Sequence, residues 1–237
     1  MIQRAAMIIP EVLQKHAGKS EARFIGSLFL LSAFAVILSF VRFGISGTSR
    51  YDFLMWNLFL AWVPLVFAWA LYVRTPKGLI WSWRNFGLFA GWLLFLPNAF
   101  YLITDFIHLR RTSQVDILFD IILFTTYAFC GVILGLTSLY LVHIRAIKRF
   151  GFSAHYLPVM VLLLCGFAIY LGRYLRWNSW DIITNPFGLL FDVSNSVIDP
   201  TNSPLTFGTT LLFYSFLGLL YVVSWQAIEL IRNNKNK

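Results

Sequence analysis

Charged residues are scarce in this sequence. Asp, Glu, Lys and Arg make up only 12% of the 237 residues, whereas 59% are hydrophobic and the mean hydropathy is +0.72. A soluble domain carries about twice that charged fraction, because polar side chains must cover its surface. The composition therefore excludes an ordinary soluble domain and predicts an integral membrane protein.

Cysteine and the familiar catalytic motifs are also scarce. The two cysteines, Cys130 and Cys165, lie within apolar runs, where a small buried side chain is the ordinary interpretation. They do not have the spacing of a zinc site. The sequence contains no glycine-rich phosphate loop, no His-Glu-x-x-His and no Gly-x-Ser-x-Gly. The sequence therefore names no cofactor and no metal.

The net charge of +9 does not indicate nucleic-acid binding. The basic residues form no continuous patch, and occur instead in short clusters between apolar runs. This distribution is typical of membrane topology. We therefore expect a lipid bilayer, and no nucleic acid, as the partner of the chain.

Six apolar runs are long enough to cross a bilayer, which takes about 20 residues in a helix. They are too apolar for amphipathic surface helices and too long for buried strands. The sequence predicts an all-α, polytopic membrane protein, in which residues 1–237 form a single six-transmembrane-helix bundle. The predicted spans are residues 24–42, 53–73, 85–104, 117–142, 156–172 and 205–228.

Lys and Arg are distributed unequally between the two ends of these spans. Thirteen of the 19 lie in the N-terminal tail, in the connections after the second and fourth spans, and at the C-terminus. Because such flanks face the cytoplasm, the sequence predicts cytoplasmic N- and C-termini, with residues 1–22 as a cytoplasmic tail. Seven of the ten acidic residues fall on the opposite side, which indicates a polar role for the outer face.

The connection between the fifth and sixth spans, residues 173–204, contains a helix signal. Asn185 before Pro186 is a typical cap followed by proline in the first turn, and apolar residues follow at helical spacing. Trp177 and Trp180 suit the membrane interface. We expect a short amphipathic helix on the outer surface, with a re-entrant segment as the alternative.

The stretch PNAFYLITDFIHL, residues 97–109, places polar side chains within an apolar run. At about 100° per residue of α-helix, one face would carry Asn98, Tyr101, Asp105 and His108. An amide and a carboxylate that faced lipid would cost several kcal/mol. This face is therefore predicted to turn toward other helices or a wet cavity near the outer boundary.

The stretch GRYLRWNSWDI, residues 172–182, offers partners for that face. Arg173 and Arg176 are three residues apart, so they point the same way if the helix continues. Arginine is suited to binding oxyanions, and histidine ionises near working pH. The predicted binding residues are Asn98, Tyr101, Arg173, Arg176 and Asn178. The predicted catalytic or cation-binding residues are Asp105, His108 and Asp181.

Three functions fit these residues. The first is a membrane enzyme that acts on a lipid or lipid-linked anionic substrate at the outer leaflet. The second is a transporter or ion-binding protein, whose outer vestibule these side chains line for a small solute. The third is a non-catalytic ion-pair network that locks the ends of the helices.

Two glycines predict a close helix contact. Gly131 and Gly135 are four residues apart in the fourth predicted span, and this spacing lets a neighbouring helix approach closely. The neighbour is either another helix of the same chain or, in a homo-oligomer, a second copy.

On three stretches the sequence resembles a bacterial family known as domain of unknown function 1361. They are NLFLAWVPL, PNAFYLITDFIHL and GRYLRWNSWDI, and the likeness covers most of the chain from about residue 23. The resemblance implies a small, multi-pass protein of the bacterial plasma membrane, and it supplies no activity. It supports the location of a site in these stretches but not the chemistry of that site.

Overall fold

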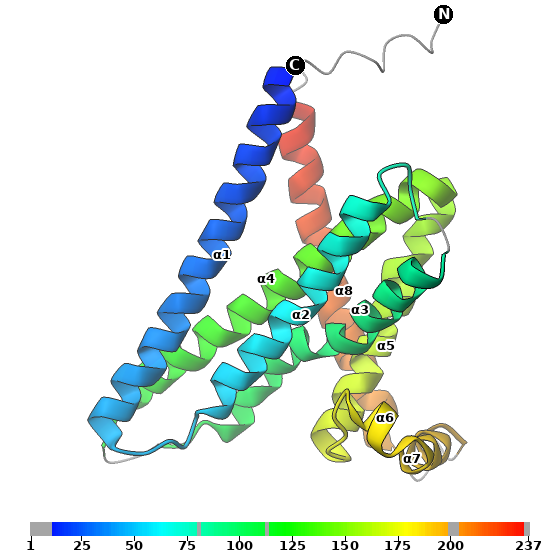
Figure 1. Cartoon of the computed structure of the whole chain (residues 1–237). Coiled ribbons are helices and arrows are strands. Elements are labelled where there is room, and N and C mark those ends of the chain that lie inside the picture. The colour runs from blue at the N-terminus through cyan, green and yellow to red at the C-terminus, as the bar shows by residue number, and fades with distance from the viewer. Residues whose placement is uncertain (1–10, 80–81, 112–113, 199–203, 235–237) are drawn as a thin grey trace, which may run out of the picture.

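The computed structural model describes residues 11–79, 82–111, 114–198 and 204–234, and these residues form helices and their connections (Figure 1). The α-helices are α1 (Glu11–Ser46), α2 (Phe53–Arg74), α3 (Trp83–Tyr101), α4 (Ile117–Phe150), α5 (Tyr156–Tyr174), α6 (Asp181–Thr184), α7 (Pro186–Ile198) and α8 (Pro204–Asn234). Two 3₁₀ helices, η1 (Leu102–His108) and η2 (Gly151–His155), extend α3 and join α4 to α5.

Five helical stretches of the described chain are long and apolar enough to cross a membrane. The longest, the 58 residues Ile117–Tyr174, contains α4, η2 and α5 together. The predicted all-α, multi-pass membrane architecture is confirmed. That the chain crosses the membrane six times remains a prediction.

The two ends of the bundle differ. Figure 1 shows that α1 begins and α8 ends at the top of the molecule, whereas α6 and α7 lie at the bottom. We call the bottom the α7 end. The chain reaches this end after α5, since α5 leads directly into α6 and α7.

The centre of the bundle is formed by α2, α3 and α4, while α5 pairs with α8. Glycines permit the α3–α4 contact. A Cβ atom on Gly131 would overlap the carbonyl oxygen of Ala99, and one on Gly135 would lie 2.6 Å from the ring of Phe100. The close contact predicted for these glycines therefore occurs within this chain.

The third predicted span does not continue as one α-helix. It changes at Tyr101 into η1, where the Thr104 hydroxyl donates to the carbonyl oxygen of Tyr101 at 2.6 Å and competes with the backbone. The prediction of one continuous α-helical face is therefore wrong beyond Tyr101. Residues three apart nevertheless eclipse in a 3₁₀ helix, so Asp105 and His108 still lie on one side.

Two other boundaries differ from the prediction. α4 continues to Phe150 rather than ending at residue 142, and it ends where Gly151 adopts a φ of 59°. Within its added turns, Arg145 donates to the carbonyl oxygens of Tyr72 and Pro76 at 3.0 and 3.1 Å. These bonds satisfy one carbonyl in the last turn of α2 and one in the connection that follows it. α1 begins at Glu11, so residues 11–22 of the predicted tail form its first turns, while residues 1–10 lie outside the described chain.

Candidate functional site

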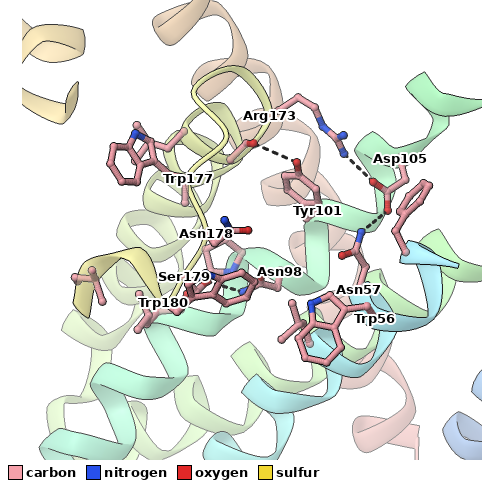
Figure 2. Close-up of a pocket in the computed structure, with 18 of the residues that line it drawn as sticks. Trp56, Asn57, Asn98, Tyr101, Asp105, Arg173, Trp177, Asn178, Ser179 and Trp180 are labelled. Carbon is pink, nitrogen blue, oxygen red and sulfur yellow. Dashed lines mark hydrogen bonds and ion pairs between the residues drawn. The ribbon is translucent and has the colours of Figure 1, made fainter. Parts of the chain in front are cut away.

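A cavity of about 380 Å³ lies at the α7 end, between α2, α3, η1, α5 and the connection from α5 to α6 (Figure 2). We call it the polar cavity. Six of the eight predicted site residues line it: Asn98, Tyr101, Asp105, His108, Arg173 and Asn178. The lining also includes Phe53, Trp56, Asn57, Leu60, Leu94, Pro97, Ala168, Leu171, Gly172, Trp177, Ser179, Trp180, Ile182 and Leu189.

A buried ion pair forms one wall of the polar cavity. The Nη2 atom of Arg173 lies 2.8 Å from Oδ1 of Asp105, and the two side chains are 13% and 1% exposed. The other carboxylate oxygen accepts a hydrogen bond from the Asn57 amide at 2.9 Å. Figure 2 shows Arg173 and Asn57 reaching Asp105 from different sides. Both carboxylate oxygens are thus occupied, and the three side chains tie α5, η1 and α2 together.

All three guanidinium nitrogens of Arg173 have partners inside the protein. Nε and Nη2 donate to the Thr104 hydroxyl, and Nη1 lies 3.1 Å from Nε2 of His108. Because a guanidinium can only donate, Nε2 of His108 accepts this bond. The guanidinium also lies 4.1 Å above the ring of Tyr101, an additional cation–π contact. The positive charge is therefore neutralised by groups of the protein.

A second set of bonds holds the connection after α5 against α3. Nδ2 of Asn98 donates to the Ser179 hydroxyl at 2.8 Å, and this hydroxyl donates to the carbonyl oxygen of Leu94 at 3.2 Å. The Tyr101 hydroxyl donates to the carbonyl oxygen of Gly172 at 3.2 Å. Asn98 and Tyr101 therefore help to shape the cavity in addition to lining it.

Two predicted site residues lie away from the polar cavity. α5 ends at Tyr174, and Arg176 is exposed with a φ of 62°, in the left-handed region. The helix that would have aligned Arg176 with Arg173 has already ended. The predicted clamp of two arginines on one helix face is therefore not formed.

Asp181 stabilises the turn before α6 instead of facing Asp105 and His108. Its carboxylate accepts a hydrogen bond from the backbone N–H of Asn178 at 2.7 Å and another from the Thr184 hydroxyl at 3.1 Å. The N–H bond from Asn178 holds the pKa of Asp181 below its usual value. No three His, Cys, Asp or Glu side chains of the described chain gather as a metal site.

Sequence reasoning missed several residues that line the cavity or bond the ion pair in its wall. Asn57 and Thr104 bond directly to the ion pair, and Trp56 and Trp180 supply aromatic walls. One indication of Asn57 was present in the sequence, because it is the polar first residue of the otherwise apolar stretch NLFLAWVPL. A single sequence does not say which of several isolated polar residues will meet.

A second buried ion pair joins α1 to α4 at a different place. Nε and Nη2 of Arg42 bond both carboxylate oxygens of Asp120, at 2.7 and 3.3 Å, and the side chains are 3% and 1% exposed. Arg42 also lies 4.0 Å above the ring of Tyr51. These residues do not line the polar cavity.

The helix beside the cavity presents an apolar face outward. On α7, Phe187, Leu190 and Phe191 are 83%, 60% and 66% exposed. The predicted cap is confirmed, because Oδ1 of Asn185 accepts the backbone N–H of Gly188 at 3.1 Å. Nε1 of Trp177 donates to Asp192 at 2.9 Å and fastens α7 to the cavity wall.

The comparisons with known proteins identify one family. The model of a family described as "Protein of unknown function (DUF1361)" matches residues 56–222. This range contains both Asp105 and Arg173 but not Arg42. No curated protein and no solved structure matches the chain.

Proposed function

This chain belongs to the DUF1361 family, whose function is unknown, and we propose that its polar cavity binds the polar head group of a lipid or lipid-linked substrate at the outer membrane face. The proposal includes six spans, because the chain reverses direction between α4 and α5 (Figure 1). With cytoplasmic termini in a bacterial plasma membrane, the α7 end is then the outer end.

The observation that carries the proposal is the position of the polar cavity beside α7. A helix that exposes Phe187, Leu190 and Phe191 at the end of a membrane bundle is suited to the boundary between head groups and acyl chains. Leu189 of the same helix lines the cavity. A lipid held against α7 would therefore have its head group next to the cavity. The volume of about 380 Å³ lies within the range of about 300–1,000 Å³ for small-molecule pockets.

Asp105 and His108 have different roles in this proposal. Asp105 positions Arg173, because both of its oxygens are already bonded within the protein. His108 is exposed, and within the described residues its Nδ1 atom has no hydrogen-bond partner. Since Nε2 accepts the bond from Arg173, the neutral ring carries its proton on Nδ1, and we assign to His108 the donation of a hydrogen bond from Nδ1 to a bound head group.

Photo-crosslinking tests the proposal. The protein would be placed in nanodiscs containing lipids with a photoactivatable diazirine on the head group, and cross-linked peptides would be mapped by mass spectrometry. We expect cross-links in residues 94–108 and 168–182, and much weaker labelling in Asn98→Leu. The matched control is Asn85→Leu, the same substitution near the opposite end of α3. Labelling spread evenly over the bundle, or equal labelling of the two variants, would refute the proposal.

A further inference from the structure

The charges that line the polar cavity cancel within the protein. Arg173 is paired with Asp105, and its remaining nitrogens donate to Thr104 and His108. A ligand anion that took Arg173 for itself would leave Asp105, 1% exposed, as a buried carboxylate without its cation. Unpaired buried charges are strongly unfavourable. The arrangement of these side chains therefore does not favour binding of an anionic substrate, which the sequence had suggested because of its two arginines.

Two indole rings of the cavity are available to a ligand. Trp56 and Trp180 are 53% and 40% exposed, and they come from different walls, α2 and the connection before α6 (Figure 2). Among the described residues, neither indole N–H has a hydrogen-bond partner. Each indole thus offers a flat apolar face and one donor.

Two amides add acceptors to these donors. Asn57 and Asn98 use their Nδ2 atoms to bond Asp105 and Ser179. Within the described chain, their carbonyl oxygens have no hydrogen-bond partner. A neutral wall that offers both donors and acceptors matches a hydroxyl group, which both donates and accepts. The indole faces match the flat C–H face of a sugar ring.

From this combination, and resting on the proposed function, we infer that the head group bound by the polar cavity is uncharged and polyhydroxylated, as in a glycosyl lipid. The paired charges disfavour an ionic head group. The indole rings and amide oxygens favour a sugar.

Competition between lipids tests the inference. A diacylglycerol with a diazirine-bearing glucosyl head would be the probe, in nanodiscs of phosphatidylcholine. Unlabelled glucosyl diacylglycerol and anionic phosphatidylglycerol with the same acyl chains would be the competitors. We expect the glucosyl lipid to compete about tenfold better, which corresponds to about 1.4 kcal/mol. Trp180→Leu should weaken its competition by a similar factor, and the control Trp69→Leu, in the half of α2 away from the cavity, should not.

The outcomes separate the two proposals. Preferential competition by phosphatidylglycerol would overturn the sugar inference and leave head-group binding in place. An absence of cavity cross-links with every lipid would overturn both. Asp105→Asn gives a second test, because it leaves the Arg173 charge uncompensated. We expect this variant to shift competition toward phosphatidylglycerol, and an unchanged preference would contradict the charge argument.

Discussion

The two buried ion pairs of this protein have the same chemistry and different surroundings. Arg42 and Asp120 are joined by two hydrogen bonds and are almost fully buried. Neither residue lines the polar cavity. Arg173 and Asp105 share a single direct contact, and the arginine is 13% exposed at the cavity. We call them the closed pair and the open pair.

The difference shows that a buried ion pair is not by itself a sign of function. The closed pair joins α1 to α4 and supports the helix-locking role, one of the three that the sequence allowed. The open pair also joins helices, but it is surrounded by amides, indoles and a histidine that face a cavity. The residues that surround an ion pair, rather than the pair itself, therefore indicate whether the pair only joins helices or belongs to a candidate binding site.

The largest effect is expected from Asp120→Asn. This change leaves Arg42 buried without a counter-charge, and we expect a loss of about 3–5 kcal/mol of stability. The measurement is thermal or denaturant unfolding of the purified protein in nanodiscs. As a control, the apolar double variant Arg42→Met with Asp120→Leu should recover most of the loss. If Asp120→Asn were no less stable than the matching Asp105→Asn, the distinction between closed and open pairs would fail.

The next effect is expected from Gly131→Ala. The added methyl group overlaps the backbone of Ala99 and contacts Leu102, which begins η1. We expect a loss of about 2–3 kcal/mol, the upper part of the range for overpacking, and weaker cross-linking at the polar cavity because η1 carries Asp105. Gly26→Ala is the matched control, since, apart from the adjacent residues and the backbone of its own helix, no described atom lies within 4 Å of the position that its methyl group would occupy. Equal unfolding curves for the two variants would contradict this packing.

Asp105→Asn should cost less than either change. Arg173 lies at the cavity, where water can hydrate it once the carboxylate is gone. We therefore expect a loss of about 1.5–2 kcal/mol, the lower part of the range for a hydrogen bond to a charged group. The altered lipid preference described above should accompany this small loss. Unfolding and cross-linking would be measured on the same preparation, and a loss as large as that of Asp120→Asn would argue that the open pair is also a lock.

The smallest effect is expected at the exposed carboxylate of Asp181. Its pKa is lowered in the folded protein, so its contribution to stability is present above the unfolded value of about 3.9. That contribution is lost as the pH falls through the lower folded value. Melting curves of the wild type and Asp181→Asn should differ slightly at pH 6 and coincide at pH 2. If the difference in melting temperature between the two proteins grew toward low pH, the proposed stabilisation of this turn by the Asp181 carboxylate would be wrong.

Most of the fold could be predicted from the sequence because hydrophobic run length is a local property. The start of α2 at Phe53 and the start of α4 at Ile117 match the predicted residues. The end of α4 was not predicted from the apolar run, since the helix continues past that run to Phe150, and its Arg145 bonds the carbonyl oxygens of Tyr72 and Pro76, far away in the chain. The change from α3 to η1, where the Thr104 hydroxyl bonds the carbonyl oxygen of Tyr101, was also not predicted from the apolar run.

The candidate site could be predicted in part for the same reason. Six of eight predicted residues line the polar cavity because an apolar segment must turn its polar side chains inward. Arg176 does not, because helix spacing applies only as far as the helix continues, and α5 ends at Tyr174. The partner of Asp105 was among the candidates, but the pairing of Arg42 with Asp120 was not predicted.

The sequence by itself determined that this chain is a multi-pass helical membrane protein and which segments hold its polar groups, because both follow from the cost of placing charge in hydrocarbon. Only the tertiary structure decided which charged side chains form ion pairs with one another. It paired Arg173 with Asp105 and placed the pair beside exposed indoles and part-buried amides. That choice depends on the packing of distant helices, which no local pattern in the chain records.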